Sequence, residues 1–546
     1  QDLGWMAMIP IRMPAMILAP ALVCCGLLTD CASSQEQSPR PNILFIFSDD
    51  HAPHAIGAYG SAFAELDPTP RIDALAAEGM LFRNSFCTNS ICGPSRAVIL
   101  TGLHSHHNGF RDNGDRFDGD QVTFPKLLQG AGYETALLGK WHLGSSPQGF
   151  DYWEVLPGQG DYYNPKLISA DGERVLEGYC TDIVTDLALE WLEGREDSKK
   201  PFLLMCQHKA PHRNWMPPLR HLDLWEDKHV TEPATLFDAH LDDAVVARLQ
   251  EMEVDRDMNL VYDLFVGEHE GWDQASGFAN DSSGFRNLAR MNELQRAAWD
   301  AAYEPRNAAF LQAKLTGKEL VRWKYQRYIK NYLRTVRGVD DSVGRLLDYL
   351  RTSGLADNTI VVYSSDQGFF LGDHGWFDKR WMYEESLRMP LIVRWPGVAA
   401  AGSVDEHLVQ NLDYAQTFLA AAGVTAPKGM QGDSLVPLLR GEDPQNWRSS
   451  IYYHYYAFPS IHRVARHYGI RTKRHKLIHY YQFGTWELFD LETDPDERMN
   501  LFGQEDCEEL TRGLMEGLRG LRLQYGDLAE TKLKSKEWQD QFRVRR

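Results

Sequence analysis

The sequence predicts an α/β fold in which a large, mixed and mainly parallel sheet lies between layers of helices. Short, uninterrupted apolar runs recur along the chain, and such runs are typical of buried strands in parallel sheets. Segments with helical periodicity separate these runs, and this alternation favours a sheet that is covered on both faces. Towards the C-terminus, aromatic-rich runs separated by turn residues indicate a smaller α+β subdomain with an antiparallel sheet.

Apolar runs are expected to form the strands of the main sheet, and they span residues 41–51, 134–140, 201–208, 358–366 and 390–397. Helices are expected between these strands, and the clearest patterns lie at 70–80, 181–194 and 332–354. We assign these elements to a main domain of residues 41–440. It is interrupted at 222–325 by an acidic and mostly helical insertion, which we expect to pack over one edge of the site.

The predicted C-terminal subdomain spans residues 441–546. Its strands are expected within 451–458, 470–481 and 485–501, with a turn at Asp494–Pro495. A helix around 507–524 is expected to follow them.

The N-terminus has the layout of a secretory signal, which we place at residues 1–34. One arginine precedes an apolar stretch from Met13 to Leu28, and small and polar residues follow. The stretch is short for a permanent membrane span, so we predict export to the periplasm, the cell surface or the medium. Residues 27–31 loosely resemble a lipoprotein cleavage site, although Asp30 fits it poorly. Contact with a membrane is therefore expected only if the leader is lipidated.

The composition excludes several classes of protein. The 546 residues include 57 basic and 76 acidic side chains, a formal net charge of −19, which argues against a general nucleic-acid-binding protein. A small site can still be locally positive and take an anionic substrate. Three of the eight cysteines lie in the leader, and the other five form no CxxC pair of a zinc site. They leave room for one disulfide, whose pairing the sequence does not assign.

Carboxylates follow two of the predicted strands at the point where each strand ends. Asp49 and Asp50 follow the first strand, and Asp366 and Gln367 follow the fourth. In α/β sheets, ligands gather at the carboxyl ends of the strands, so we expect these side chains to lie close together. Unpaired buried charge is costly, and a hard divalent cation such as Ca²⁺ takes oxygen ligands of this kind. The sequence therefore predicts a metal site at this edge of the sheet.

Residues 92–96 read Cys-Gly-Pro-Ser-Arg, and Leu-Thr-Gly follows at 100–102. A structural cysteine favours apolar neighbours and a partner thiol, so Cys92 in this setting indicates chemistry. In register with the strand-end residues, C-x-P-S-R is a specific pattern. From about Pro41 to residue 501, the chain resembles the type I sulfatases of the alkaline phosphatase superfamily, and among them carbohydrate sulfatases such as N-acetylglucosamine-6-sulfatases. The resemblance implies an alkaline phosphatase-like form of the predicted fold.

The resemblance implies that Cys92 becomes the catalytic nucleophile after oxidation to formylglycine. A formylglycine-generating enzyme, which reads the C-x-P-x-R segment before folding, would be the maturation partner. One hydroxyl of the hydrated aldehyde attacks sulfur, and the other expels sulfate by re-forming the aldehyde. If residues 94–102 open a helix, its free amides face the anion, and Arg96 holds the ionised diol by a charge-assisted hydrogen bond.

The resemblance also implies one calcium ion as cofactor. Its ligands would be Asp49, Asp50, Asp366 and Gln367, with the modified Cys92 completing the shell. Gln367 departs from the family, which usually has asparagine at this position. Its longer side chain still presents an amide oxygen, so Gln367 is kept as a ligand.

Four further catalytic residues follow from the resemblance. Lys140 and His142 match the pair that grips sulfate and the nucleophile, and His212 matches a histidine that contacts sulfate and assists the leaving group. Lys379 matches the second sulfate-binding lysine, a candidate general acid toward the ester oxygen. Cations and calcium around one sulfate group would supply the electrostatic stabilisation that the transfer needs.

Four residues are candidates for a sugar-binding pocket rim. Asp373 and His374 lie a few residues past a metal-binding aspartate, where a capped loop is the alternative interpretation. Arg213 and Trp215 are similar candidates, and Trp215 would either stack on a sugar face or pack the insertion.

The sequence thus predicts a sulfuric ester hydrolase that acts on sulfated carbohydrates, and the first hypothesis is exo-acting 6-O-desulfation of N-acetylglucosamine-6-sulfate. A sulfatase for iduronate, galactose or algal glycans is the alternative. A phosphoesterase of the same superfamily would carry Thr or Ser as nucleophile, so Cys92 argues against it. A non-catalytic glycan-binding protein would lack parts of the machinery, whereas every expected position is filled here.

Overall fold

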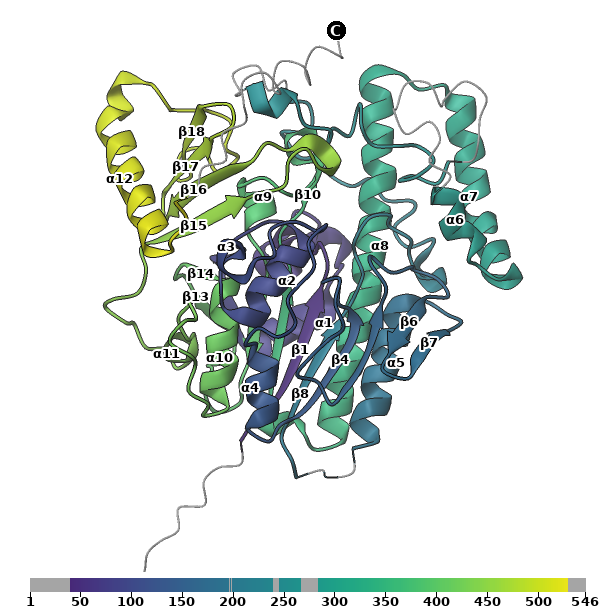
Figure 1. Cartoon of the computed structure of the whole chain (residues 1–546). Helices are drawn as coiled ribbons and strands as arrows, with labels where there is room; N and C mark the ends of the chain where they lie inside the picture. The colour runs from purple at the N-terminus through teal and green to yellow at the C-terminus, as the bar shows by residue number, and fades with distance from the viewer. Residues whose placement is uncertain (1–39, 196, 198, 239–244, 267–282, 529–546) are drawn as a thin grey trace, which may run out of the picture. The chain divides into compact units, whose positions relative to one another are not determined.

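A computed structural model describes residues 40–195, 197, 199–238, 245–266 and 283–528, and Figure 1 shows how their helices and strands are arranged. The predicted leader at 1–34 and its cleavage site at 27–31 lie outside the described residues. Within the described ranges, no helix combines the length and the apolar character that crossing a membrane requires.

In this part of the chain, the main sheet has ten strands in the order β13-β2-β12-β9-β1-β8-β4-β5-β6-β7. The predicted strands all belong to it, as β1 (Asn42–Ser48), β4 (Glu134–Lys140), β8 (Phe202–Gln207), β9 (Thr359–Ser365) and β12 (Leu391–Arg394). The others are β2 (Met80–Phe82), β5 (Tyr152–Leu156), β6 (Lys166–Ser169), β7 (Gly172–Val175) and β13 (Ser403–Asp405). Because β9, β1, β8, β4 and β5 run parallel, their carboxyl ends lie at one edge of the sheet.

The direction of β12 differs from the prediction of a parallel strand, because β12 runs antiparallel to both β9 and β2. A parallel neighbour needs a crossover that returns the chain to the opposite end of the sheet. Between β9 and β12 the chain forms the short strands β10 (Phe370–Leu371) and β11 (Phe377–Asp378) and the one-turn helix α9 (Glu384–Leu387). It therefore re-enters the sheet from the carboxyl end, and the sheet is mixed.

The alternation of side chains along β1 explains why its whole run is apolar. Phe45 packs into the core on one face of the sheet, and Ile46 packs into the core on the other. The first core includes residues of α2 (Cys92–Thr101), α4 (Phe124–Gly130) and α10 (Tyr414–Ala421). The second includes residues of α1 (Pro70–Glu78), α5 (Cys180–Glu193) and α8 (Gly317–Thr352). The three predicted helices are confirmed, and the third is the C-terminal half of α8.

The segment expected as a helical insertion, 222–325, is less helical than predicted in its first part. Its described residues form a 3₁₀ helix (Val245–Arg248), α6 (Ser283–Ala289), α7 (Glu293–Ala313) and the start of α8. The rest of 222–238 and 245–266 forms turns and irregular chain, while 239–244 and 267–282 lie outside the described residues. A reciprocal capping box between Asn292 and Gln295 defines the start of α7.

The C-terminal part forms a separate antiparallel sheet, as predicted. It consists of β15 (Ser450–Tyr455), β16 (His467–Thr472), β17 (His475–Tyr480) and β18 (Thr485–Asp490). The helix α12 (Glu508–Gln524) packs on it through Leu514 and Leu518, beside these strands in Figure 1. The domain limits at 41–440 and 441–546 stay predictions.

Smaller elements complete the described chain. They are β3 (Ser85–Phe86), β14 (Val409–Gln410), α3 (Ser105–Asn108) and α11 (Val436–Leu439), and the 3₁₀ helices Pro53–Ala55, Gly57–Tyr59, Ala64–Leu66, Leu219–His221, Ala356–Asn358, Asp373–Gly375, Asn411–Asp413, Ile461–Arg463 and Glu505–Cys507.

Candidate active site

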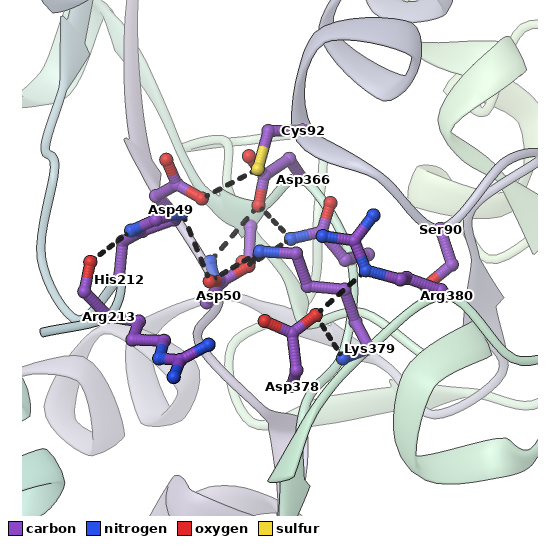
Figure 2. A network of polar contacts seen from close by, with 12 residues as sticks. Asp49, Asp50, Ser90, Cys92, His212, Arg213, Asp366, Asp378, Lys379 and Arg380 are labelled. Carbon is purple, nitrogen blue, oxygen red and sulfur yellow. Dashed lines mark hydrogen bonds and ion pairs between the residues drawn. The ribbon is translucent and has the colours of Figure 1, made fainter. Parts of the chain in front are cut away.

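The strand ends bring the predicted metal ligands together. Asp49 and Asp50 follow β1, Asp366 and Gln367 follow β9, and the two strands are parallel neighbours. One carboxylate oxygen from each of the three aspartates lies within 4.8 Å of the others, and all three side chains are fully buried. Figure 2 shows them converging. Burial raises the pKa of Asp50 to about 7, although the neighbouring Lys379 acts in the opposite direction.

This donor set fits a hard divalent cation. The amide nitrogen of Gln367 donates to Asp50 and, at 2.8 Å, to Asp366, whereas its buried Oε1 has no hydrogen-bond partner among the described residues. A buried amide oxygen without a partner is costly, and a cation would satisfy it. Rotation of the amide can turn this oxygen toward the carboxylates. Clustered oxygen donors are the ligands that Ca²⁺ prefers.

Cys92 is the first residue of α2 and faces the carboxylates. Its Sγ lies 3.4 Å from Oδ1 of Asp49, and only 1% of the residue is exposed. Burial raises the pKa of the Cys92 thiol to about 12. Since the thiolate is the reactive form of cysteine, the unmodified side chain is a poor nucleophile here.

Arg96 holds the strand ends in place. Its Nε and Nη2 donate to Oδ2 of Asp366 at 3.1 and 3.0 Å. Its Nη1 donates to the carbonyl oxygen of Lys140 at 2.8 Å and to Oε1 of Gln207 at 2.7 Å. One guanidinium therefore connects the ends of β9, β4 and β8 beneath Cys92.

The two predicted lysines reach the carboxylates from different strands: Lys140 is the last residue of β4, and Lys379 follows β11. Lys140 pairs with Asp49 and donates to Oε1 of Gln159 at 2.6 Å. Lys379 donates to both carboxylate oxygens of Asp50 at 2.5 and 2.6 Å. Although burial acts to lower it, Asp50 raises the pKa of Lys379 above its ordinary value, so this lysine keeps its proton at neutral pH.

The two predicted histidines are neutral at this site. Burial, with Lys140 adding to it, lowers the pKa of His142 to about 2. Burial and the same cations hold the pKa of His212 well below its ordinary value. In a neutral His212, Nδ1 donates to the carbonyl oxygen of Arg213 at 2.5 Å, which leaves an unprotonated Nε2 3.8 Å from Asp50.

Three residues of the site were missed by the sequence analysis. Asp378 and Arg380 flank Lys379 and pair with each other at 3.2 Å, as Figure 2 shows. His462 comes from the chain between β15 and β16, and its Nε2 lies 3.3 Å from Asp378 and 3.1 Å from Arg213. The position beside a predicted catalytic lysine could have indicated the first two. No local pattern pointed to His462.

Arg213 lies beside His212 and His462, and its role in sugar binding stays a prediction. It forms two hydrogen bonds, of 2.6 and 2.9 Å, with the buried Asp263. It also lines a cavity of about 510 Å³, together with Lys209, His212 and Tyr262. This cavity adjoins the catalytic groups through His212.

The prediction that Trp215 stacks on a sugar at the rim is wrong. Trp215 is fully buried, and its ring packs on Tyr328 and Phe369 with centroid distances of 4.4 and 6.2 Å. The turn after β8 directs it into a core formed by α8 and residues of the 222–325 segment, which agrees with the alternative interpretation that Trp215 packs the insertion.

The pair Asp373 and His374 is also largely structural. Asp373 pairs with His54 at 3.2 Å and accepts a hydrogen bond from the backbone of Leu371. His374 is 3% exposed and packs against the rings of Trp376 and Tyr383. These contacts favour the capped-loop interpretation over sugar binding.

Comparison with known proteins identifies the family of the chain. A sequence profile named Sulfatase matches residues 41–424, and one named N-sulphoglucosamine sulphohydrolase, C-terminal, matches 372–524. The chain belongs to the sulfatase family. It is a sulfuric ester hydrolase, and the predicted alkaline phosphatase-like fold is confirmed.

Individual sulfatases cover nearly the whole chain. The N-acetylglucosamine-6-O-sulfatase of Bacteroides thetaiotaomicron is 48% identical over 510 residues, which cover 92% of this chain and 89% of the relative. The human N-acetylglucosamine-6-sulfatase is 26% identical over 475 residues, with 82% and 72% covered. A solved structure of a protein in complex with its substrate, D-glucosamine-2-N,6-O-disulfate, has a TM-score of 0.85 and 47% identity, and covers 90% of this chain and 99% of that chain.

Proposed function

We propose that this sulfatase removes the 6-O-sulfate of N-acetylglucosamine-6-sulfate units and acts at the ends of sulfated glycans. The observation that carries the proposal is the placement of Cys92 against a buried carboxylate cluster that also contacts the ammonium groups of Lys140 and Lys379. The similar bacterial relative is named for 6-O-desulfation of N-acetylglucosamine. The similar solved structure holds a 6-O-sulfated glucosamine.

The residues of the site would divide the work as follows. Asp49, Asp50, Asp366 and Gln367 would hold Ca²⁺, which supplies Lewis acidity toward a sulfate oxygen and neutralises the carboxylates. Formylglycine at position 92 would supply two hydroxyl groups, one for attack on sulfur and one for release of sulfate. Arg96 orients Asp366 and the residues around position 92.

Two residues in different protonation states would donate and accept protons in the reaction. The protonated Lys379 is suited to hydrogen-bond the ester oxygen as the alcohol leaves. The neutral His212 presents an unprotonated Nε2 on the side of Asp50 and is suited to accept a proton from a hydroxyl group.

Sugar binding would fall to the cluster beside Lys379. Although burial acts to raise it, His462 and Lys379 hold the pKa of Asp378 well below its ordinary value, so Asp378 is ionised. A carboxylate and the guanidinium of Arg380 together offer acceptors and donors that match sugar hydroxyl groups. The cluster lies within two residues of the lysine that would meet the ester.

Maturation would have to precede folding. Cys92 is 1% exposed and begins a helix whose residues are all buried, so a modifying enzyme cannot reach it in the folded chain. We propose that a formylglycine-generating enzyme acts on residues 92–96 during export, before the site closes. This formylglycine-generating enzyme should convert Cys92 in the nascent or unfolded chain and leave it unmodified in the folded protein. The mass of the peptide that contains Cys92 would measure the conversion in each case.

The first test is sulfate release by protein in which peptide mass shows full conversion of Cys92. N-acetylglucosamine-6-sulfate should be desulfated in preference to galactose-, iduronate- and N-sulfated sugars. Release from another sugar would overturn the substrate and keep the chemistry. A sulfated tetrasaccharide should lose sulfate first at one end, whereas internal loss would contradict exo-action. Hydrolysis of phosphate monoesters in place of sulfate esters would contradict the reaction class.

Removal of the metal tests the calcium assignment separately. Chelation should lower both activity and the melting temperature, and Ca²⁺ should restore both, because a bound ligand stabilises the folded state by mass action. Gln367→Ala should weaken Ca²⁺ binding, with Gln367→Asn as the conservative control. Equal Ca²⁺ affinity in all three proteins would remove Gln367 from the ligand set.

A further inference from the structure

A second cavity lies between α7 and α8, and cations dominate its walls. Its volume is about 540 Å³. The basic residues that line it are Arg306, Arg327, Lys330 and Arg334. Among its described lining residues, Glu226 is the one carboxylate. A locally basic cavity is unexpected in a protein with a net charge of −19.

The cavity is separate from the active site. Arg327, Lys330 and Arg334 follow one another at spacings of three and four residues, so they share one face of α8. Tyr328 and Tyr332 lie on the opposite face, since consecutive residues are about 100° apart around a helix. The Tyr332 hydroxyl accepts from the amide of Ala52 and donates to the carbonyl oxygen of Asp50, both at the active site. Helix α8 therefore stands between the two cavities.

The positive charge of the cavity is only partly compensated. Glu226 is shared by Arg334 at 2.6 Å and Arg306 at 3.3 Å. Arg306 also pairs with Asp223, whose side chain is 84% exposed. Arg306 and Arg334 therefore each have a carboxylate partner.

Arg327 and Lys330 have no such partner. Arg327 donates to the carbonyl oxygen of Leu264 at 3.4 Å and to Asn307 at 3.1 Å, and Lys330 donates to the carbonyl oxygen of Glu226 at 2.9 Å. Within the described ranges, neither forms an ion pair with a carboxylate, although they are only 7% and 9% exposed. Burial lowers the pKa of Arg327 to about 10. The Glu226 carboxylate acts on both side chains only through space, and buried cations whose charge is incompletely compensated favour the binding of an anion.

We propose that the cavity between α7 and α8 binds an oxyanion of the sulfate type. The guanidinium fork of Arg327 and the ammonium of Lys330 offer charge-assisted hydrogen bonds of the kind that sulfate oxygens accept. This chemistry has two sources: free sulfate, or a further sulfate group on a glycan whose terminal unit occupies the active site. The second source rests on the proposed function, whereas the anion site does not.

Selenate is the probe for the site, because it has the shape of sulfate and its selenium scatters anomalously. Crystals of full-length protein soaked in selenate should show an anomalous peak between Arg327 and Lys330. Ala309 lines the cavity from the exposed side of α7, so Ala309→Glu supplies the missing carboxylate without removing a contact. The peak should vanish in Ala309→Glu and persist in Ala308→Glu, whose site is exposed on the same helix but outside the lining.

No peak in the unsubstituted protein, or an equal peak in Ala309→Glu, would overturn the inference. Kinetics then separate the sources. If the anion belongs to the glycan, Ala309→Glu should raise KM for a multiply sulfated tetrasaccharide about tenfold, as loss of one ion pair predicts, and leave the sulfated monosaccharide unaffected. If Ala309→Glu loses the selenate peak but KM is unchanged for both the tetrasaccharide and the monosaccharide, the site binds free sulfate. A selenate peak in a protein inactive on every sulfated sugar would refute the proposed function and keep this site.

Discussion

At the scale of single residues, burial decides which groups of the site are charged. The same low-dielectric surroundings keep the Cys92 thiol and the His212 imidazole neutral, while Lys379 stays protonated because Asp50 lies beside it. A buried thiol with a pKa of about 12 is unsuited to attack. This agrees with the proposal that a modified Cys92, rather than the thiol, carries the chemistry.

Substitution of Cys92 separates attack from release. Cys92→Ala should fold normally and lose sulfate release by at least about 10³-fold, since the nucleophile is gone. Cys92→Ser keeps one hydroxyl and lacks the second, so it should release about one desulfated sugar per enzyme molecule and retain the sulfate as a stalled ester on the serine. Both proteins are assayed in a single-turnover and a multiple-turnover experiment. Repeated turnover by a cleanly folded Cys92→Ala protein would refute the mechanism.

Arg380 allows a test of the sugar-binding cluster. Arg380→Met keeps the length of the side chain and removes its donors, so KM for N-acetylglucosamine-6-sulfate should rise by about tenfold or more. Desulfation of a small aryl sulfate, which has no sugar hydroxyl groups, should change much less. Equal losses on both substrates would show that Arg380 positions Asp378 and Lys379 instead of binding the sugar.

At the scale of elements, the ends of parallel strands assemble the site. β9, β1, β8 and β4 are consecutive neighbours; the first three end just before Asp366, Asp49 and His208, and β4 ends at Lys140. Helix α2 is joined to them by Ser95, which donates to the carbonyl oxygen of Asp366 and accepts from Asn411. The position of Cys92 is thus tied to Asp366, at the end of β9, through hydrogen bonds rather than through sequence proximity.

Gly139 is the residue of β4 that sets the position of Lys140. Its φ is +95°, and a Cβ there would overlap the carbonyl oxygen of Gln207. Gly139→Ala should therefore lower the free energy of unfolding by about 3 kcal/mol or more, because strain and overlap add. Gly130→Ala at the end of α4 is the control, since a Cβ there meets nothing and should be neutral or stabilising. Denaturant unfolding of both proteins measures the difference; similar midpoints would contradict the assigned role of Gly139.

At the scale of the whole molecule, the core contains several neutral histidines. Fully buried His467 packs on the rings of Trp381, Tyr453 and Tyr480, and burial lowers its pKa to about 3. His454 shows the same direction, with a pKa of about 4. Unfolding exposes these side chains and returns their pKa values to about 6.5.

The stability of the protein should accordingly fall with acidification. Between about pH 6.5 and the folded pKa of about 3, the unfolded chain binds a proton at His467 and the folded chain does not. The stabilisation is full above pH 6.5, and about 2 kcal/mol from this residue should be lost near pH 5. Melting temperatures across this range should fall less steeply for His467→Phe, which cannot titrate. Parallel curves for the two proteins would contradict the assignment.

Much of the fold was predictable, because local patterns carry it. Continuous apolar runs marked strands such as β1 and β9, whose two faces are both buried, and helical periodicity marked α1 and α5. The direction of β12 was not predictable, since it depends on how far the chain travels after β9. The burial of Trp215 was not predictable either, because the local sequence around an aromatic residue in a polar loop is the same whether its ring lies at a pocket rim or in a core.

The sequence by itself determined the family: C-x-P-S-R, in register with aspartates after two buried strands, carries the resemblance to the sulfatases, which predicts the nucleophile position, and the clustered carboxylates predict an oxygen-rich cation site. The tertiary structure alone decided what surrounds that chemistry. It brought His462 and Asp263 to Arg213, and Glu226 to Arg334, across long stretches of chain. Such partners are chosen by the packing of whole elements, and that packing leaves no periodic or local trace in the sequence.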